Sequence, residues 1–428
     1  MPQFTPIQKR LVAEGLSFPT SLCFDPEGNA YVAESGLPWD GAVKGGRVFR
    51  ILANGEKQLL AEGLRHPLNG LCWYQSALIV SEGGFPGRIS RLTIDGVRST
   101  ILDDLPGMGN YHTNMVAVGS DGKLYFSQGA LTNLGVIGLD AYELGWLGRL
   151  PHNADMPGYP ITLRGQSFET ENPLSGEKGA RSFTGAFAEF GQTHTPGTRL
   201  NAALPCTASI MRCNPDGSEL ELVAWGIRNA YGLGFLPDGR LIATDQGSDE
   251  RGSRQIGHVP ELMFEIKQGA WYGWPDFVGG VPVTDPRFRS SRGDALDFIL
   301  SNHEELPKPE KPLLALPVNS AATKFDALPL THPKYPGQII LALFGDEKPM
   351  TAPLGFKSGR NISRVDPADW SHHPLPDLEL NRPIDVRYNP QDDSIWILDF
   401  GEFEMSEKGV EAQKETGKIW KVNAADLF

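Results

Sequence analysis

The chain has 428 residues, enough for two or three domains of ordinary size or for one large repeat fold. With 49 Gly and 34 Pro residues, 40% hydrophobic residues and only 21% charged residues, the composition excludes a disordered chain and a long helical bundle. The formal net charge of −13 gives no counterion release on a phosphate backbone, so we expect neither nucleic acid nor an anionic membrane surface as a partner.

A pattern of two apolar strands joined by a tight turn recurs six times along the chain. Each copy begins with a turn containing Pro or Asn, and its second strand ends in an acidic or amide residue beside Gly. The six copies are residues 15–36, 63–84, 107–129, 226–247, 316–346 and 380–401. The DG and EG turns between their apolar runs predict β-hairpins.

A second hairpin follows several of these copies, at residues 46–63, 87–104 and 208–226. Two hairpins make one four-stranded sheet, and the spacing of the first copies fits one propeller blade each. Six copies therefore predict an all-β fold, a six-bladed β-propeller. Because no Ser/Gly-rich or charged linker interrupts the chain, we expect residues 1–428 to form a single domain.

Two stretches are too long for bare blades, namely residues about 130–207 and 248–315. Loops of this length in a compact fold are usually functional, so we expect both to lie over one face as lids. A tolerated surface insertion is the alternative.

The register of the repeat predicts which polar residues share a rim. If the first strand of each copy is innermost, its start and the end of the second strand lie at the same end of the blade. The strand starts carry Arg65, His66, Asn69, His112, Asn114, Arg228, Asn229, Asn319, Ser320 and Arg382. The strand ends carry Glu34, Glu82, Gln128, Asp245, Gln246, Asp346 and Asp399. We therefore expect a funnel lined with Arg, Asn, His and carboxylate groups.

The chemistry of these residue types suggests possible roles. Arg228, Asn229 and Arg382 are planar donors suited to carboxylate or quinone oxygens, and His112 has the near-neutral pKa of a general base. Carboxylates and main-chain carbonyls are hard oxygen ligands of the kind calcium takes. Alternatively, the arginines form ion pairs between blades, and the strand-end acids cap backbone amides.

The compartment is left open by the sequence. Residues 1–16 lack the apolar stretch of a signal peptide, and no apolar run approaches the ~20 residues of a membrane span. We expect a soluble protein, either cytoplasmic or an exported mature form without its leader. Cys206 and Cys213 could form a disulfide in an oxidising compartment or remain buried thiols.

Three motifs carry a resemblance to a known family. The stretches GIRNAYGLGF (226–235), TDQG (244–247) and VPELMFEIKQGAWYGWPDF (259–277) resemble the soluble glucose/sorbosone dehydrogenases, a family of six-bladed propellers. The stretches GNYHTNMVAVGSDGKLYFSQG (109–129) and NRPIDVRYNPQDDSIWILDFG (381–401) are similar to the family's His-bearing strand and last blade.

The resemblance implies oxidation of a small sugar-like substrate, with pyrroloquinoline quinone (PQQ) as hydride acceptor and calcium polarising the quinone. It implies that His112 is the base, and that Arg228, Asn229, Gln246 and Arg382 contact the cofactor. With these we group Asn69 as a further cofactor contact. The main chain of Gly247 and Ser248, together with Asp245, would bind calcium.

Some positions differ from the family pattern. The second Arg expected after Arg382 is Ile384, a Thr is replaced by Val318, and the cofactor lysine has no secure counterpart among Lys324, Lys348 and Lys357. Two alternatives therefore stay open: a calcium-dependent lactonase-type hydrolase in which His112 activates water, and a non-catalytic binding propeller. The oligomeric state is not indicated.

Overall fold

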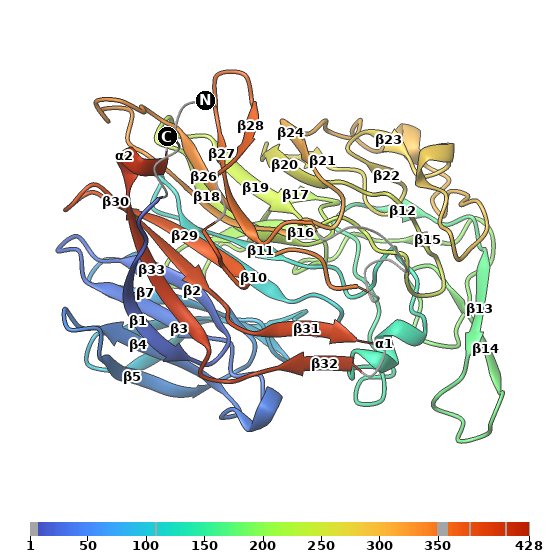
Figure 1. Ribbon diagram of the computed structural model, residues 1–428. Coiled ribbons are helices and arrows are strands. Elements are labelled where there is room, and N and C mark those ends of the chain that lie inside the picture. Colours follow the sequence, from blue (N-terminus) through green and yellow to red (C-terminus); the bar gives the residue numbers. More distant parts are fainter. Residues whose placement is uncertain (1–6, 108, 349–357, 376–377, 407–408, 428) are drawn as a thin grey trace.

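The computed structural model describes residues 7–107, 109–348, 358–375, 378–406 and 409–427. Five antiparallel sheets of four strands and one sheet of five strands are arranged as six blades (Figure 1). The inner strands of neighbouring blades contact one another around the ring. The all-β six-bladed propeller predicted from the repeats is therefore confirmed, and each repeat copy forms the two inner strands of one blade.

The first three blades follow the chain in order. From inner to outer strand they are β2 (Pro19–Phe24), β3 (Ala30–Glu34), β4 (Gly46–Ile51) and β5 (Lys57–Leu64); β6 (Leu68–Tyr74), β7 (Ala77–Glu82), β8 (Gly87–Thr93) and β9 (Arg98–Leu105); and β10 (Thr113–Val118), β11 (Leu124–Gln128), β16 (Ser209–Cys213), β17 (Glu221–Trp225) and the short parallel strand β21 (Ala270–Trp271).

The last three blades also follow the chain in order, except that the outermost strand of the sixth blade comes from the beginning of the chain. They are β18 (Ala230–Phe235), β19 (Leu241–Asp245), β20 (Glu261–Glu265) and β24 (Leu314–Leu316); β25 (Ala322–Ala327), β26 (Ile339–Leu343), β27 (Asn361–Val365) and β28 (His372–Pro374); and β29 (Pro383–Asn389), β30 (Ser394–Asp399), β33 (Gly417–Asn423) and β1 (Arg10–Leu16). Strand β1 pairs antiparallel with β33 and so closes the ring.

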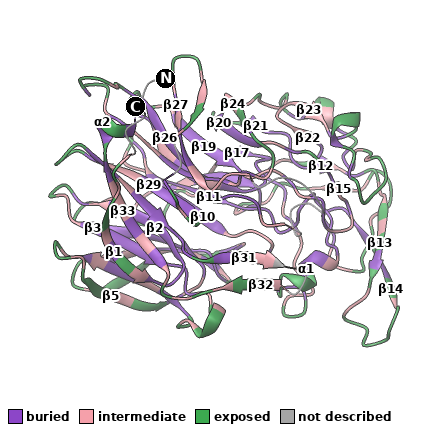
Figure 2. Cartoon of the chain, in the orientation of Figure 1, coloured by how far each residue is buried: buried purple, intermediate pink, exposed green. Residues whose placement is uncertain are grey.

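The tight turns inside the repeat copies use glycine where the backbone requires it. Gly122 and Gly239 have φ values of 76° and 92°, a region that glycine enters without steric cost. Apolar residues of the inner strands are buried between blades, whereas the outermost strands carry exposed residues (Figure 2). Local turn chemistry and strand alternation thus build each blade.

The remaining elements lie in the connections between blade strands, except for the last helix, which follows β33. They are α1 (Leu139–Glu143), β12 (Ile161–Thr162), β13 (Ser167–Glu171), β14 (Arg181–Gly185), β15 (Arg199–Leu200), β22 (Phe277–Val278), β23 (Val281–Pro282), β31 (Phe403–Ser406), β32 (Gly409–Ala412) and α2 (Ala424–Leu427), with 3₁₀ turns at Trp39–Gly41, Pro286–Phe288 and His303–Glu305. Residues 248–315, expected to be a loop over the funnel, also contain β20 and most of β24 of the fourth blade and β21 of the third blade.

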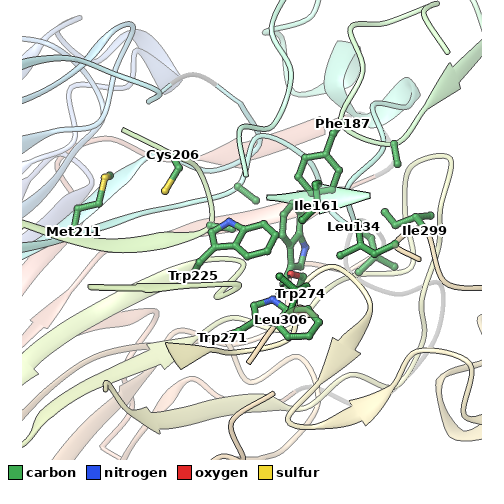
Figure 3. Close-up of a cluster of buried hydrophobic side chains, with 14 of the residues drawn as sticks. Leu134, Ile161, Phe187, Cys206, Met211, Trp225, Trp271, Trp274, Ile299 and Leu306 are labelled. Atoms are coloured by element: carbon green, nitrogen blue, oxygen red, sulfur yellow. Dashed lines mark hydrogen bonds between the residues drawn. The ribbon is translucent and has the colours of Figure 1, made fainter. Parts of the chain in front are cut away.

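A tryptophan-rich core fastens both long insertions to the third blade (Figure 3). Trp225 of β17 stacks with Trp271 of β21 at a ring-centroid distance of 6.4 Å. Phe187 from the first insertion meets Trp274 edge-on at 5.8 Å, and Ile299 from the second insertion joins the same cluster. Both insertions are therefore anchored by buried apolar contacts.

Cys206 and Cys213 are buried free thiols, so of the two alternatives for this pair the structure has the thiols and not the disulfide. Among the described residues, no helix has the length and apolar character needed to cross a membrane.

Candidate functional site

Two adjoining cavities form the funnel. The strand-side cavity has a volume of about 230 Å³ and is lined by residues of all six blades, including Asn69, His112 and Asn229. The lid-side cavity has a volume of about 240 Å³ and is lined by Arg228, Gly247 and residues of the loops above the rim. Both cavities share Trp39, Asn110, Tyr111, Gln246, Phe344, Glu347 and Phe403. We call these seven shared residues the neck of the funnel.

Backbone bulges aim one side chain from each blade into the strand-side cavity. Near the start of every inner strand, the register with the second strand shifts; in β6, for example, Leu68 pairs with Glu82 and Gly70 with Ser81, which leaves Asn69 between them. Bulges of this kind re-aim side chains. The residues placed at the six shifts that also line the cavity are Thr20, Asn69, Asn114, Tyr231, Thr323 and Ile384.

Four amide side chains form a hydrogen-bonded row along one side of the cavity. Asn69 Nδ2 donates to Asn114 Oδ1 at 3.2 Å, Asn114 Nδ2 donates to Asn229 Oδ1 at 2.8 Å, and Asn229 Nδ2 donates to Gln246 Oε1 at 2.8 Å. All four line the strand-side cavity. Because each amide is oriented by its neighbour, the row presents ordered donors and acceptors to a ligand.

His112 lies at the edge of this amide row, just before β10. Its Nδ1 is 2.8 Å from the carbonyl oxygen of Gly107, which can only accept, so Nδ1 carries the proton. Burial lowers the pKa of the imidazole, and the nearby His66 lowers it further. At neutral pH His112 is therefore a neutral imidazole whose Nε2 holds a free lone pair, the state that a general base requires.

Arg228 lines the lid-side cavity, where its guanidinium lies 4.4 Å from the centre of the Tyr111 ring. Its Nε donates to the carbonyl of Gln246 at 2.9 Å, and its Nη1 donates to Asn133 Oδ1 at 2.8 Å. Asp249 lies 3.4 Å from the same Nη1. The guanidinium is thus held in place by the insertions, with one face against Tyr111.

Arg382 is buried and does not line either cavity. Its guanidinium donates to the carbonyl oxygens of Phe403, Phe344 and Asp346 and to the carboxylate of Glu404. In this conformation its donors bind the protein itself and tie β31 to the loop after β26. The structure therefore does not bring Arg382 together with the other predicted site residues.

Of the three predicted calcium ligands, Gly247 lines the lid-side cavity, and Ser248 and Asp245 do not. The Gly247 amide donates to Glu261 Oε2 at 3.1 Å. The Ser248 hydroxyl donates to the Asn133 carbonyl at 3.3 Å. Asp245 is buried and accepts from the Asn229 amide at 2.8 Å, and burial raises the pKa of its carboxyl to about 6.

The oxygen groups around Gly247 and Glu261 in the lid-side cavity fit a hard cation such as calcium. Glu261 also lines the cavity, and burial raises the pKa of its carboxyl to about 8, a shift that a bound cation would reverse. Within the described ranges, no three His, Cys, Asp or Glu side chains are grouped to hold a metal ion. A cation here would therefore depend on main-chain carbonyls, such as those of Gly247 and Ser248, besides Glu261.

The funnel offers donors for the oxygen atoms of a quinone but few cations for its three carboxylates. The amide row and Arg228 offer donors to quinone oxygens. Ile384 presents an aliphatic side chain to the cavity, and Val318 does not line it. Lys324 is buried, donates to the carbonyls of Thr20 and Asn69, and has a pKa lowered to about 7 by burial.

The other lysine candidates add no clear cationic partner. Lys348 lies beside Glu347 in the chain and lines neither cavity, and Lys357 lies outside the described residues. Arg251 also lines the lid-side cavity, but it already pairs with Asp140 and Asp249. A bound quinone would therefore depend on Arg228 and a cation for charge compensation.

Several of the strand-end acids cap backbone amides. Glu34 accepts from the Ser17 amide at 2.9 Å, and Glu82 accepts from the Arg65 amide at 2.7 Å. Asp399 accepts from the Arg382 amide at 2.9 Å. These three acids therefore cap backbone amides, which is the alternative role expected from the sequence.

Residues absent from the sequence predictions also line the funnel. These are chiefly the aromatic side chains and the acids of the loops: Trp39, Tyr111, Tyr231, Phe344, Phe400, Phe403, Asp249, Glu261 and Glu347. The six bulge residues could have been identified from the sequence, because each lies two residues before the central apolar residue of its strand, as Asn69 does before Leu71. Phe344 and Phe400 directly follow the second strand of their copies, as Gln246 does, whereas Trp39, Phe403 and the loop acids have no such repeat position.

No protein-family model and no curated protein match this sequence. Solved structures do. The PQQ-bound form of an aldose sugar dehydrogenase from Streptomyces coelicolor is 16% identical, with a TM-score of 0.56 over 98% of this chain and 99% of that one. The holo form of the PQQ domain of a pyranose dehydrogenase from Coprinopsis cinerea is 13% identical, with a TM-score of 0.56 over 99% of both chains. The apo form of a soluble aldose sugar dehydrogenase from Escherichia coli is 13% identical, with a TM-score of 0.55 over 98% of this chain and 99% of that one. The likeness extends over the whole chain and shows a shared propeller fold.

Proposed function

We propose that the protein is an oxidoreductase that oxidises a hydroxyl or aldehyde group of a sugar-like small molecule, with PQQ as hydride acceptor and calcium as an accompanying ion. The observation that carries the proposal is His112, a neutral imidazole with a free Nε2 at the edge of an ordered amide row. The fold shared with sugar dehydrogenases supports the same assignment.

In this proposal each residue has a defined task. His112 Nε2 accepts the proton of the substrate hydroxyl while the hydride leaves the adjacent carbon, so that a CH–OH group becomes a C=O group. The carbonyl of Gly107 holds the imidazole in the tautomer that leaves Nε2 free. When bound, the quinone would supply the hydride acceptor and calcium the Lewis acid.

The amide row, Arg228 and the aromatic walls bind and orient the reactants. Asn69, Asn229 and Gln246 would hold oxygen atoms of the cofactor, and Arg228 would add the single cation of this set. Main-chain carbonyls of Gly247 and Ser248, with Glu261 beside them, would hold calcium. The second insertion, which supplies Asp249 and Arg251 to the lid-side cavity, would limit the access of water.

The proposal is tested by titrating the purified chain with PQQ in the presence of calcium and following the quinone absorbance, then measuring dye reduction with a panel of aldoses. We expect saturable binding that a calcium chelator reverses, because Arg228 alone cannot balance three carboxylates. No binding at micromolar quinone would refute the proposal. Chelator-sensitive lactone hydrolysis without quinone would point instead to the hydrolase alternative.

The role of His112 is tested by His112→Gln. We expect kcat to fall by about 10²- to 10⁴-fold, the usual contribution of a general base, with quinone affinity preserved. The matched control is His152→Gln, because the His152 side chain is 84% exposed and lies outside both funnel cavities. Equal kcat values for His112→Gln and the parent protein would exclude His112 as the base.

A further inference from the structure

Glu347 is the acidic residue of the neck and lines both cavities. Its carboxyl makes no hydrogen bond or ion pair with the described part of the chain. Burial raises its pKa to about 7, and Asp249 and Asp346 act in the same direction. A carboxyl group so placed gains most from a ligand that brings a positive charge.

The two cations that act on Glu347 are already engaged elsewhere. Arg382 donates to three carbonyl oxygens and to Glu404. Arg251 donates to Asp140 at 2.9 Å, to Asp249 at 3.1 Å and to the Tyr111 hydroxyl. Neither arginine forms an ion pair with Glu347 in this structure.

Aromatic rings surround the same part of the funnel. Trp39, Tyr111, Phe344 and Phe403 are all shared by the two cavities, as Glu347 is. Trp39 and Phe403 pack against each other with ring centroids 5.3 Å apart. Arg228 and Arg251 already lie over the Tyr111 ring, and Arg382 lies over the rings of Phe344 and Phe403, whereas no cation of the described residues lies over Trp39. A carboxyl group and an indole ring both attract an ammonium group, and Trp39 is the ring of the neck left for a ligand.

We propose that the neck selects a positively charged substrate, an amino sugar, with Glu347 and Trp39 binding its ammonium group. This inference rests on the proposed function and names the substrate class of that same site. A neutral sugar would leave the Glu347 carboxyl without a cation, and an acidic sugar would place two carboxylates in one narrow passage. Glu347 is thus a specificity-determining residue, separate from the proton transfer assigned to His112.

The test compares three sugars with similar rings and different charges: glucosamine, glucose and glucuronate. Their binding to the full-length chain is measured by calorimetry, with and without added quinone and calcium, and their turnover is measured separately. We expect glucosamine to bind about ten- to a hundredfold more tightly than glucose, as for a hydrogen bond to a charged group, and glucuronate to bind most weakly.

Glu347→Gln should abolish the preference for glucosamine over glucose. Glu304→Gln, which removes an exposed carboxyl outside both cavities, should preserve the preference. Equal affinities for glucosamine and glucose in the parent protein, a preference that survives Glu347→Gln, or binding of none of the sugars would overturn the inference.

The binding and turnover measurements separate this inference from the proposed function. Glu347-dependent binding of glucosamine without turnover would support the inference and count against the oxidoreductase. Quinone-dependent turnover of neutral aldoses without any preference for glucosamine would support the oxidoreductase and count against the inference about Glu347.

Discussion

At the scale of single residues, two contacts decide the state of His112. The Gly107 carbonyl holds the proton on Nδ1, and burial disfavours the charged imidazolium. Together they keep Nε2 available, and within the described part of the chain no carboxylate bonds to the ring. In a polar funnel this arrangement gives a base that is ready at neutral pH.

This state predicts a pH dependence of catalysis. The pKa of His112 lies below its ordinary value of 6.5, so the base stays unprotonated at neutral pH and becomes protonated only when the pH falls through that lowered pKa. We expect kcat/KM to be constant around neutral pH and to decrease on the acid side, with a midpoint below about pH 6.5. A pH–rate profile with saturating quinone checks this, and activity that rises as the pH falls through this range would contradict it.

At the scale of elements, one buried ion pair anchors the second insertion. Asp276 is fully buried and binds Arg254 Nη2 at 2.8 Å and His303 Nε2 at 3.0 Å. It also accepts from the backbone amides of Ile299 and Leu300. These contacts join the segment after β21 to the chain that leads to β24, beside the tryptophan core, where His303 stacks on Trp271.

Replacing this carboxylate should destabilise the protein strongly. Asp276→Asn leaves the Arg254 charge buried and uncompensated, so we expect the free energy of unfolding to fall by about 3–5 kcal/mol in chemical denaturation. The control is Asp297→Asn, whose side chain is 60% exposed and pairs with the exposed Arg164; there we expect a loss of at most about 1 kcal/mol. Similar losses for the two variants would show that the buried pair does not anchor the insertion.

At the scale of the whole molecule, ring closure and the funnel wall share one core. Leu16 of β1 is fully buried in a cluster that also contains Phe344, Ile384, Phe400 and Phe403, and all four of these residues line the funnel. The strand that closes the last blade therefore also supports the aromatic wall of the site.

This arrangement predicts different effects of two substitutions in β1. Leu16→Ala removes a fully buried side chain, so we expect a loss of about 2–5 kcal/mol in unfolding free energy. Leu11→Ala, in the same strand but 41% exposed, should cost less than about 1 kcal/mol. Guanidinium unfolding measures both, and equal effects would mean that the closing strand does not support this core.

Much of the architecture could be predicted because it depends on short-range signals. The DG and EG turns and the alternation of apolar residues lie within each repeat copy, so the number of blades and the register of their inner strands follow from the sequence. The same register placed His112, Asn69, Asn229 and Gln246 at one rim, and the structure brings their side chains into one cavity.

The rest of the site depends on contacts between distant segments. Arg382 occupies an equivalent rim position in the last blade, yet carbonyl oxygens from two other loops take up its donors. Glu347 and Trp39 reach the neck from loops outside the repeat. The sequence by itself determined the fold and one row of polar groups, because turn and strand preferences are local. Only the tertiary structure decided which charges stay free, because hydrogen-bond partners and burial depend on which distant segments meet.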